Sequence, residues 1–180
     1  WLACVVRSAS RTSVAIGTFG SSASICEGIE LGSFLADNMV LAREPLEARL
    51  WGWSDDVGET ISVSIDGEEI SEASTSVQDD GSWIMNLPPR EASAGPHTLT
   101  FSGSGSASAV TLKNVAFGDV FLCSGQSNME WTFAQSAKVD QDYAKSLINN
   151  DMIRFFHVDK HLQSGIPLDD TMGRWKRSKE

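Results

Sequence analysis

Residues 61–65 (Ile-Ser-Val-Ser-Ile) alternate strictly between apolar and polar side chains, and this pattern constrains the fold more than any other. A period of two is typical of a strand with one buried and one exposed face. Asp66-Gly67 follows at once, and this dipeptide favours a two-residue hairpin turn, in which both positions need positive φ angles. The segment therefore predicts a strand that turns back into an antiparallel neighbour.

Further short segments have a strand-like composition and are separated by turn signals. They are residues 48–53, 82–87, 97–101 and 109–112, with turns at 55–58 and 80–81 and a stop at Pro88-Pro89. Strands separated by turns about every 8–12 residues are typical of an antiparallel β-sandwich. We expect this sandwich over residues 29–117. Residues 1–28 are rich in Ser, Ala and Gly, and we expect them to be irregular or poorly ordered.

The pattern changes at Gly118. Residues 119–123 (Asp-Val-Phe-Leu-Cys) are nearly all apolar, which is typical of a strand buried on both faces of a parallel sheet. Residues 139–148 have apolar side chains at helical spacing, and residues 152–158 form another strand-like run. Strand, helix and strand make a βαβ unit, so we expect an α/β domain over residues 118–180. One such unit cannot cover its own sheet, so we expect this domain to be incomplete here.

Composition excludes several classes of partner and cofactor. The 180 residues carry a formal net charge of −10, which argues against nucleic acids and anionic membranes as partners, because both select clustered Lys and Arg. No apolar run approaches the ~20 residues of a membrane-spanning helix. The three cysteines lack C-x-x-C spacing, so we expect no zinc site and no other cofactor. We expect Cys123 to be a buried free thiol, whereas a Cys4–Cys26 disulfide and a signal peptide ending near residue 6 both stay open.

Residues 122–128 (Leu-Cys-Ser-Gly-Gln-Ser-Asn) carry the most specific chemistry in the sequence. A serine nucleophile needs a rigid position at a strand end, backbone N–H groups for the oxyanion, and a base. The segment follows the expected buried strand, where ligands bind in open α/β sheets, and Gly125 permits a tight turn. Spacing alone does not separate Ser124 from Ser127, nor exclude that both merely cap a helix.

The longer segment 117–130 (Phe-Gly-Asp-Val-Phe-Leu-Cys-Ser-Gly-Gln-Ser-Asn-Met-Glu) resembles the nucleophile block of the sialate O-acetylesterase family, within the SGNH (GDSL-like) hydrolases. Segments 37–41, 51–53, 80–83, 153–156 and 173–175 also resemble that family. The resemblance implies that Ser127, in the Gly-Gln-Ser triplet, is the nucleophile, and that the second domain is flavodoxin-like. It also implies an esterase that removes acetyl groups from sugars or glycans, in a secreted, lysosomal or periplasmic protein.

The resemblance also shows what is missing. SGNH enzymes take their Asp and His from a late D-x-x-H block and further oxyanion donors from a G-x-N-D-like block, and neither occurs here. We therefore expect the catalytic Asp and His to lie beyond residue 180, in the rest of the hydrolase domain, and this chain alone to be nearly inactive. The other candidate pocket or oxyanion-adjacent residues are Gly125, Gln126, Asn128 and Trp131.

Other functions stay open on the sequence. An acetylxylan-type esterase shares the Gly-Gln-Ser-Asn-Met core, and the sandwich could be a non-catalytic carbohydrate-binding or packing module. His157 and His161 have a spacing that binds zinc on a helix. In an extended strand that step spans roughly 13 Å, so we expect no metal there, although His157 stays open as a substitute base. We expect Trp51, Trp53 and Trp83 to pack in the core.

Overall fold

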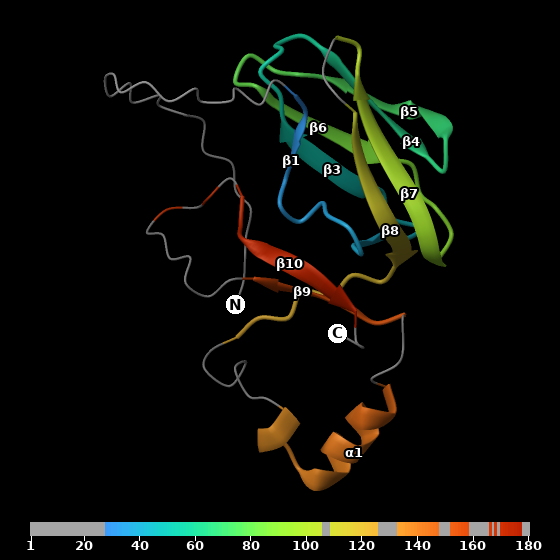
Figure 1. The fold of residues 1–180 in the computed structure, drawn as a ribbon, viewed down its shortest axis with the longest axis vertical. Helices are drawn as coiled ribbons and strands as arrows, with labels where there is room; N and C mark the ends of the chain where they lie inside the picture. Colours follow the sequence, from blue (N-terminus) through green and yellow to red (C-terminus); the bar gives the residue numbers. More distant parts are fainter. Residues whose placement is uncertain are drawn as a thin grey trace.

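The computed structural model describes residues 28–105, 109–125, 133–147, 152–158, 166, 168 and 170–177. Most of its strands form two sheets that face each other (Figure 1). The smaller sheet has the order β1-β3-β6, with strands Glu30–Leu31, Ala48–Trp53 and Ser82–Leu87. The larger sheet has the order β2-β8-β7-β4-β5, with strands Val40–Ala42, Val110–Gly118, Ser93–Gly103, Thr60–Ile65 and Glu68–Ser76. The expected β-sandwich architecture is present.

The hairpin predicted from the alternating segment is confirmed. In β4 the side chains of Ile61, Val63 and Ile65 are buried, and the serines between them are half-buried. Asp66 has a φ of 53° and Gly67 a φ of 88°, as the two central positions of this turn require. The chain then returns as β5, antiparallel to β4.

The core lies between the two sheets, and the aromatic pair Trp83–Phe101 connects them with ring centroids 5.9 Å apart. Both side chains are fully buried, which contributes about 1.5–3 kcal/mol for a large apolar group. Trp83 thus has the predicted core role, whereas Trp51 and Trp53 are only half-buried. Other fully buried side chains from both sheets complete the core: Leu50, Ile61, Val63, Leu87, Leu99 and Val115.

Gly52 marks the closest approach between β1 and β3. A Cβ atom there would lie 2.0 Å from the carbonyl oxygen of Glu30 and 2.6 Å from Cζ2 of Trp83. Both distances are far below van der Waals contact. The glycine therefore leaves the space that the backbone of β1 and the Trp83 ring both occupy next to β3.

The segment after the sandwich differs from the sequence-based prediction. Residues 119–123 form no strand, Phe121 and Leu122 are 82% and 70% exposed, and Cys123 is an exposed thiol instead of a buried one. A strand buried on both faces needs strands beside it and helices over it. Among the described residues no strand lies next to 119–123, which explains its exposure.

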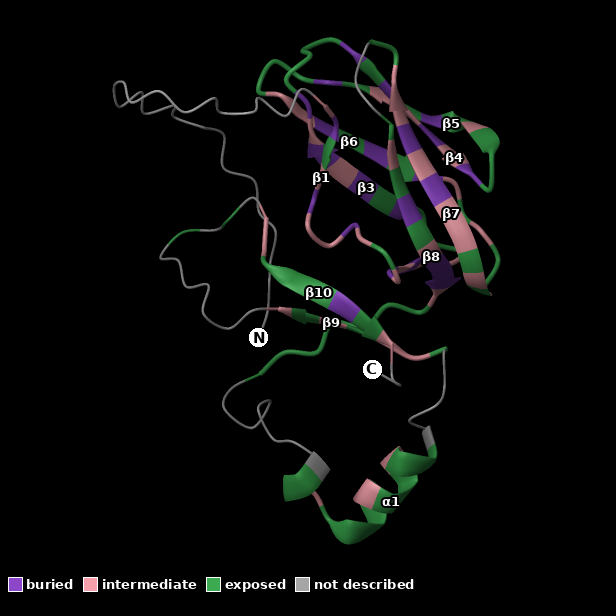
Figure 2. Ribbon diagram, viewed as in Figure 1, coloured by how far each residue is buried: buried purple, intermediate pink, exposed green. Residues whose placement is uncertain are grey.

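The predicted helix and the strand after it are present but do not form a βαβ unit with residues 119–123. A short 3-10 helix, η2 (Phe133–Gln135), precedes α1 (Lys138–Leu147), and β9 (Arg154–Val158) follows. The partner of β9 is the antiparallel strand β10 (Gly173–Arg177), a pairing that the sequence did not predict. Figure 2 shows α1 as largely exposed; its apolar residues Val139 and Tyr143 contact no core.

Arg154 joins β9 to the sandwich. Its guanidinium donates hydrogen bonds to the carbonyl oxygens of Met39 (3.1 Å), Ala94 (2.9 Å) and Asn114. The five N–H groups of arginine form a planar fork that can bind several acceptors at once. One side chain thus connects β9 with the loop before β2 and with both β7 and β8.

Trp175 of β10 makes a second connection. Its ring lies 4.9 Å from that of Phe34 and 5.5 Å from that of Phe156, and its indole N–H donates to the carbonyl oxygen of Phe34 at 2.7 Å. Next to it, Asp170 accepts a hydrogen bond from the backbone N–H of Ser33 at 2.9 Å. The β9–β10 pair is therefore held to the loop after β1 by aromatic packing and by polar contacts.

Candidate active site

The predicted nucleophile lies outside the described residues. One described segment ends at Gly125, which is exposed, and the next begins at residue 133. Gln126, Ser127, Asn128 and Trp131 fall in the interval between them, so their predicted roles stay predictions. What the structure describes is the surface from which this segment departs.

That surface is a groove of about 1160 Å³ between the end of β8, residues 119–123 and β9. Its wall is mostly apolar and includes Phe34, Val40, Phe117, Phe121, Leu122 and Phe155. Sites for small molecules are typically concave and apolar with a few polar groups. The groove thus has the character of a binding site. Residues 118–123 of its wall directly precede the serine motif in the sequence.

Two features fix the position of the chain where it enters the groove. The parallel pairing of β2 with β8 holds Gly118 opposite Ala42. Beyond it, the side chain of Arg43 donates to Asp119 at 3.0 Å, an exposed ion pair of the kind that contributes less than about 1 kcal/mol. Pairing of the strands, more than this ion pair, therefore sets the start of residues 119–125.

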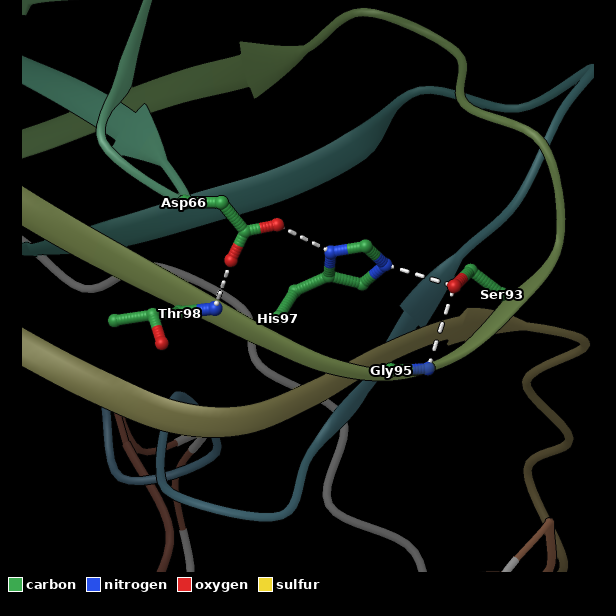
Figure 3. Close-up of polar contacts among 5 residues, drawn as sticks. All are labelled: Asp66, Ser93, Gly95, His97 and Thr98. Carbon is green, nitrogen blue, oxygen red and sulfur yellow. Dashed lines mark hydrogen bonds and ion pairs between the residues drawn. The ribbon is translucent and has the colours of Figure 1, made fainter.

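A polar chain of three side chains, Asp66, His97 and Ser93, lies where β7 begins (Figure 3). Asp66 Oδ2 lies 2.7 Å from His97 Nδ1, and His97 Nε2 lies 2.8 Å from Ser93 Oγ. The second oxygen of Asp66 accepts from the backbone N–H of Thr98 at 2.8 Å, and Ser93 Oγ accepts from that of Gly95 at 3.3 Å. Ser93 is also part of the groove wall.

The charge of Asp66 determines the direction of these bonds. The hydrogen bond from His97, followed by that from the Thr98 N–H, holds the pKa of the Asp66 carboxyl below its ordinary value. An ionised carboxylate only accepts, so Nδ1 of His97 carries the proton that is shared with Asp66. In the neutral ring Nε2 is then an acceptor, and the hydroxyl of Ser93 donates to it.

Sequence reasoning did not find this group. The sequence pattern predicts Asp66 as a turn residue and His97 as the first residue of the strand 97–101. The register of β4 against β7 pairs Ile65 with Leu99 and so brings Asp66 near His97. A 31-residue separation leaves no local signal for that contact. The sequence predicts both strands, but the contact between Asp66 and His97 follows only when the order of the strands in the sheet is also known.

Of the two remaining histidine candidates, only His157 lies among the described residues. His157 lies in β9, is exposed and forms part of the groove wall, while His161 lies outside the described residues. Among the residues that the structure describes, no cluster of three or more His, Cys, Asp or Glu side chains is arranged to hold a metal ion. Within the same residues, no helix has the length and apolar character needed to span a membrane.

Comparison with known proteins relates the chain to esterases. It is homologous to part of sialate O-acetylesterase: it is 33% identical to the Mus musculus protein over an alignment of 148 residues that covers 79% of this chain and 27% of that protein. The Rattus norvegicus and Homo sapiens sialate O-acetylesterases are each 36% identical over 113 residues, or 60% of this chain. The chain thus spans only 20% to 27% of the length of these relatives.

Other comparisons add little. No family model matches the chain. Among solved structures, the tandem Ig repeats of Dlar have a TM-score of 0.33 and 14% identity, covering 51% of this chain and 46% of that one.

Proposed function

We propose that this chain is the portion of a carbohydrate O-acetylesterase that supplies the serine nucleophile, and that Ser127 is this residue. The observation that carries the proposal is the homology to sialate O-acetylesterase over 79% of the chain. An aligned span of that size includes residue 127 wherever it begins in 180 residues. The Ser-Gly-Gln-Ser-Asn-Met motif lies within it.

The proposed reaction is acyl transfer in two steps. Ser127 Oγ attacks the acetyl carbonyl of an O-acetylated sugar, and the backbone N–H of Ser127 stabilises the oxyanion. The sugar hydroxyl leaves, and water then hydrolyses the acetyl-serine. The base that accepts and returns the proton is a histidine oriented by an aspartate, both supplied by the remainder of an SGNH hydrolase domain in cis.

The exposed apolar side chains in the groove wall support this proposal. Val120, Phe121 and Leu122 are exposed and lie directly before the motif. When further strands of the domain pair with residues 119–123, these side chains become buried and the serine stands at the carboxyl end of a sheet strand. Contacts of Arg154 and Trp175 with the sandwich provide a fixed base for that assembly.

The test uses the full-length protein and acetate release from O-acetylated sialic acid. We expect Ser127→Ala to lower kcat/KM by about 10⁴-fold or more, because removal of a catalytic serine leaves only binding and oxyanion stabilisation. Ser124→Ala is the matched control and is expected to stay within about tenfold of the parent. Full activity of the Ser127→Ala protein would refute the assignment. The same assay with acetylated xylan decides which sugar is preferred.

A further inference from the structure

We propose that Ser93, His97 and Asp66 form a second acyl-accepting site, independent of Ser127, in which Ser93 is a nucleophile activated by His97. The site would take small acyl esters from the groove. It is built from the first part of β7, which carries Ser93 and His97, and from the turn after β4, which carries Asp66, so all three residues are among the described ones.

The first support is the geometry of the base and the nucleophile. A general base must lie within about 2.6–3.2 Å of the atom whose proton it takes. His97 Nε2 lies 2.8 Å from Ser93 Oγ, and in the neutral ring with its proton on Nδ1, toward Asp66, Nε2 accepts the hydrogen bond from the Ser93 hydroxyl, which is the productive direction. The same three side-chain types in this order activate serine on several unrelated folds.

The second support is the rigidity of the histidine. Its ring packs edge-on against Phe117, with centroids 5.5 Å apart, and the Asp66 carboxylate is fixed in turn by the Thr98 N–H. Neither side chain has to move for the proton to pass. His97 is therefore held as a base, and Asp66 acts through it as a positioning residue.

The third support is access. Ser93 belongs to the wall of the 1160 Å³ groove, and its neighbours in the wall are the small residues Ala92 and Ala94. The Gly95 N–H donates to Ser93 Oγ, which favours negative charge on that oxygen as the proton leaves. Ser93 is therefore the member of the three through which an ester held in the groove would reach the site.

The reaction balances without any further reagent. The Oγ–H bond breaks and its proton passes to His97 Nε2, while Oγ bonds to the acyl carbon. The ester C–O bond breaks, and the alcohol leaves with the proton from Nε2. Water then attacks the acyl-serine by the same route and releases the carboxylic acid and free Ser93.

The experiment is covalent labelling of the 180-residue chain with a fluorophosphonate, in which Oγ displaces fluoride from phosphorus. Ser124→Ala and Ser127→Ala are present throughout, so failure of the proposed function leaves this result unaffected. We expect a single adduct on Ser93 by peptide mass mapping, and loss of that adduct when the chain is unfolded in urea. His97→Gln is expected to lower the labelling rate by about 100-fold or more, the usual contribution of general-base catalysis.

A matched control is Ser62→Ala, because the Ser62 hydroxyl in the same sheet bonds the backbone carbonyl of Ser102 instead of an imidazole. It should leave the adduct unchanged. Asp66→Asn keeps an acceptor for the Thr98 N–H and should slow labelling without unfolding the sheet, which circular dichroism checks. A folded chain without an adduct on Ser93, or equal labelling rates in the parent and in His97→Gln, would overturn the proposal.

Discussion

The guanidinium of Arg154 donates a hydrogen bond to the carbonyl oxygen of Met39 at 3.1 Å, across 115 residues of sequence. Met39 is fully buried directly before β2, so this contact attaches the later strand β9 to the edge of the sandwich core. The same side chain also binds the carbonyls of Ala94 and Asn114. Arg154 is therefore the single residue on which the attachment of β9 most depends.

Arg154→Lys should lower the free energy of unfolding by about 2 kcal/mol, because an ammonium group cannot reach three carbonyls in fork geometry. Urea denaturation followed by tryptophan fluorescence measures the change. The control is Arg174→Lys on the neighbouring strand β10, where the side chain is exposed and we expect a change within about 0.5 kcal/mol. Equal losses in the two variants would contradict the role given to Arg154.

Gly52→Ala should destabilise the chain by about 1–3 kcal/mol, the usual cost of an added methyl group in a packed site. The new Cβ would overlap a backbone oxygen of β1, which cannot rotate away. Thermal unfolding measures the effect. In the control Gly118→Ala, the nearest atom is Cγ1 of the Val40 side chain at 3.3 Å, so a small adjustment suffices. The prediction fails if the two variants melt at the same temperature.

Asp66→Asn should change how stability depends on pH. Folding lowers the pKa of the Asp66 carboxyl, so the folded state favours the ionised form. That contribution is complete above the ordinary carboxyl pKa and is lost as the pH falls through the lowered folded-state pKa. It should be no more than about 1 kcal/mol, because Asp66 is half exposed.

The measurement is urea denaturation of the parent chain and of Asp66→Asn at several pH values between neutral and strongly acidic. The difference in free energy of unfolding should be present at neutral pH and shrink on acidification. Asp79→Asn, an exposed position in another turn, is the control for general effects of charge removal. A difference that stays constant at every pH would rule out this linkage.

Phe121→Ser combined with Leu122→Ser should reduce the binding of a fluorescent hydrophobic dye to the 180-residue chain. These side chains are exposed in the groove wall and contribute apolar surface without core packing. Stability should change by less than about 0.5 kcal/mol. Leu46→Ser, at an exposed leucine outside that wall, is the control for dye binding. Unchanged fluorescence of the double variant would show that the groove is not the dye site.

The sandwich was largely predictable because its signals are local. Alternation at 61–65 predicts a strand and which of its side chains are buried, and the Asp66-Gly67 dipeptide predicts the turn after it, all within seven residues. By contrast, β5 has few buried side chains and its pattern is mostly exposed, so periodicity gave no reason to assign it. An edge strand of this kind is defined by its hydrogen bonds to β4 and not by its composition.

The segment after the sandwich was less predictable, for the opposite reason. Residues 119–123 have the composition of a buried strand, but a strand exists only where neighbours supply its hydrogen bonds. Trp175 has no apolar neighbours in the sequence between residues 173 and 180, yet it packs against Phe34, 141 residues earlier. Contacts of this length leave no periodic signal, and the polar group at Ser93 and His97 escaped notice for the same reason.

The parallel pairing of β2 with β8 has a consequence for biosynthesis. Val40–Ala42 must wait for Ala116–Gly118 before it can join its sheet. Closing so long a loop is entropically costly, and such non-local pairings form late. On a ribosome, which delivers the chain from its N-terminus, the last edge of the sandwich can therefore close only after residues 116–118 have emerged. The serine motif follows directly in the sequence, so it would emerge next to a platform that has just become complete.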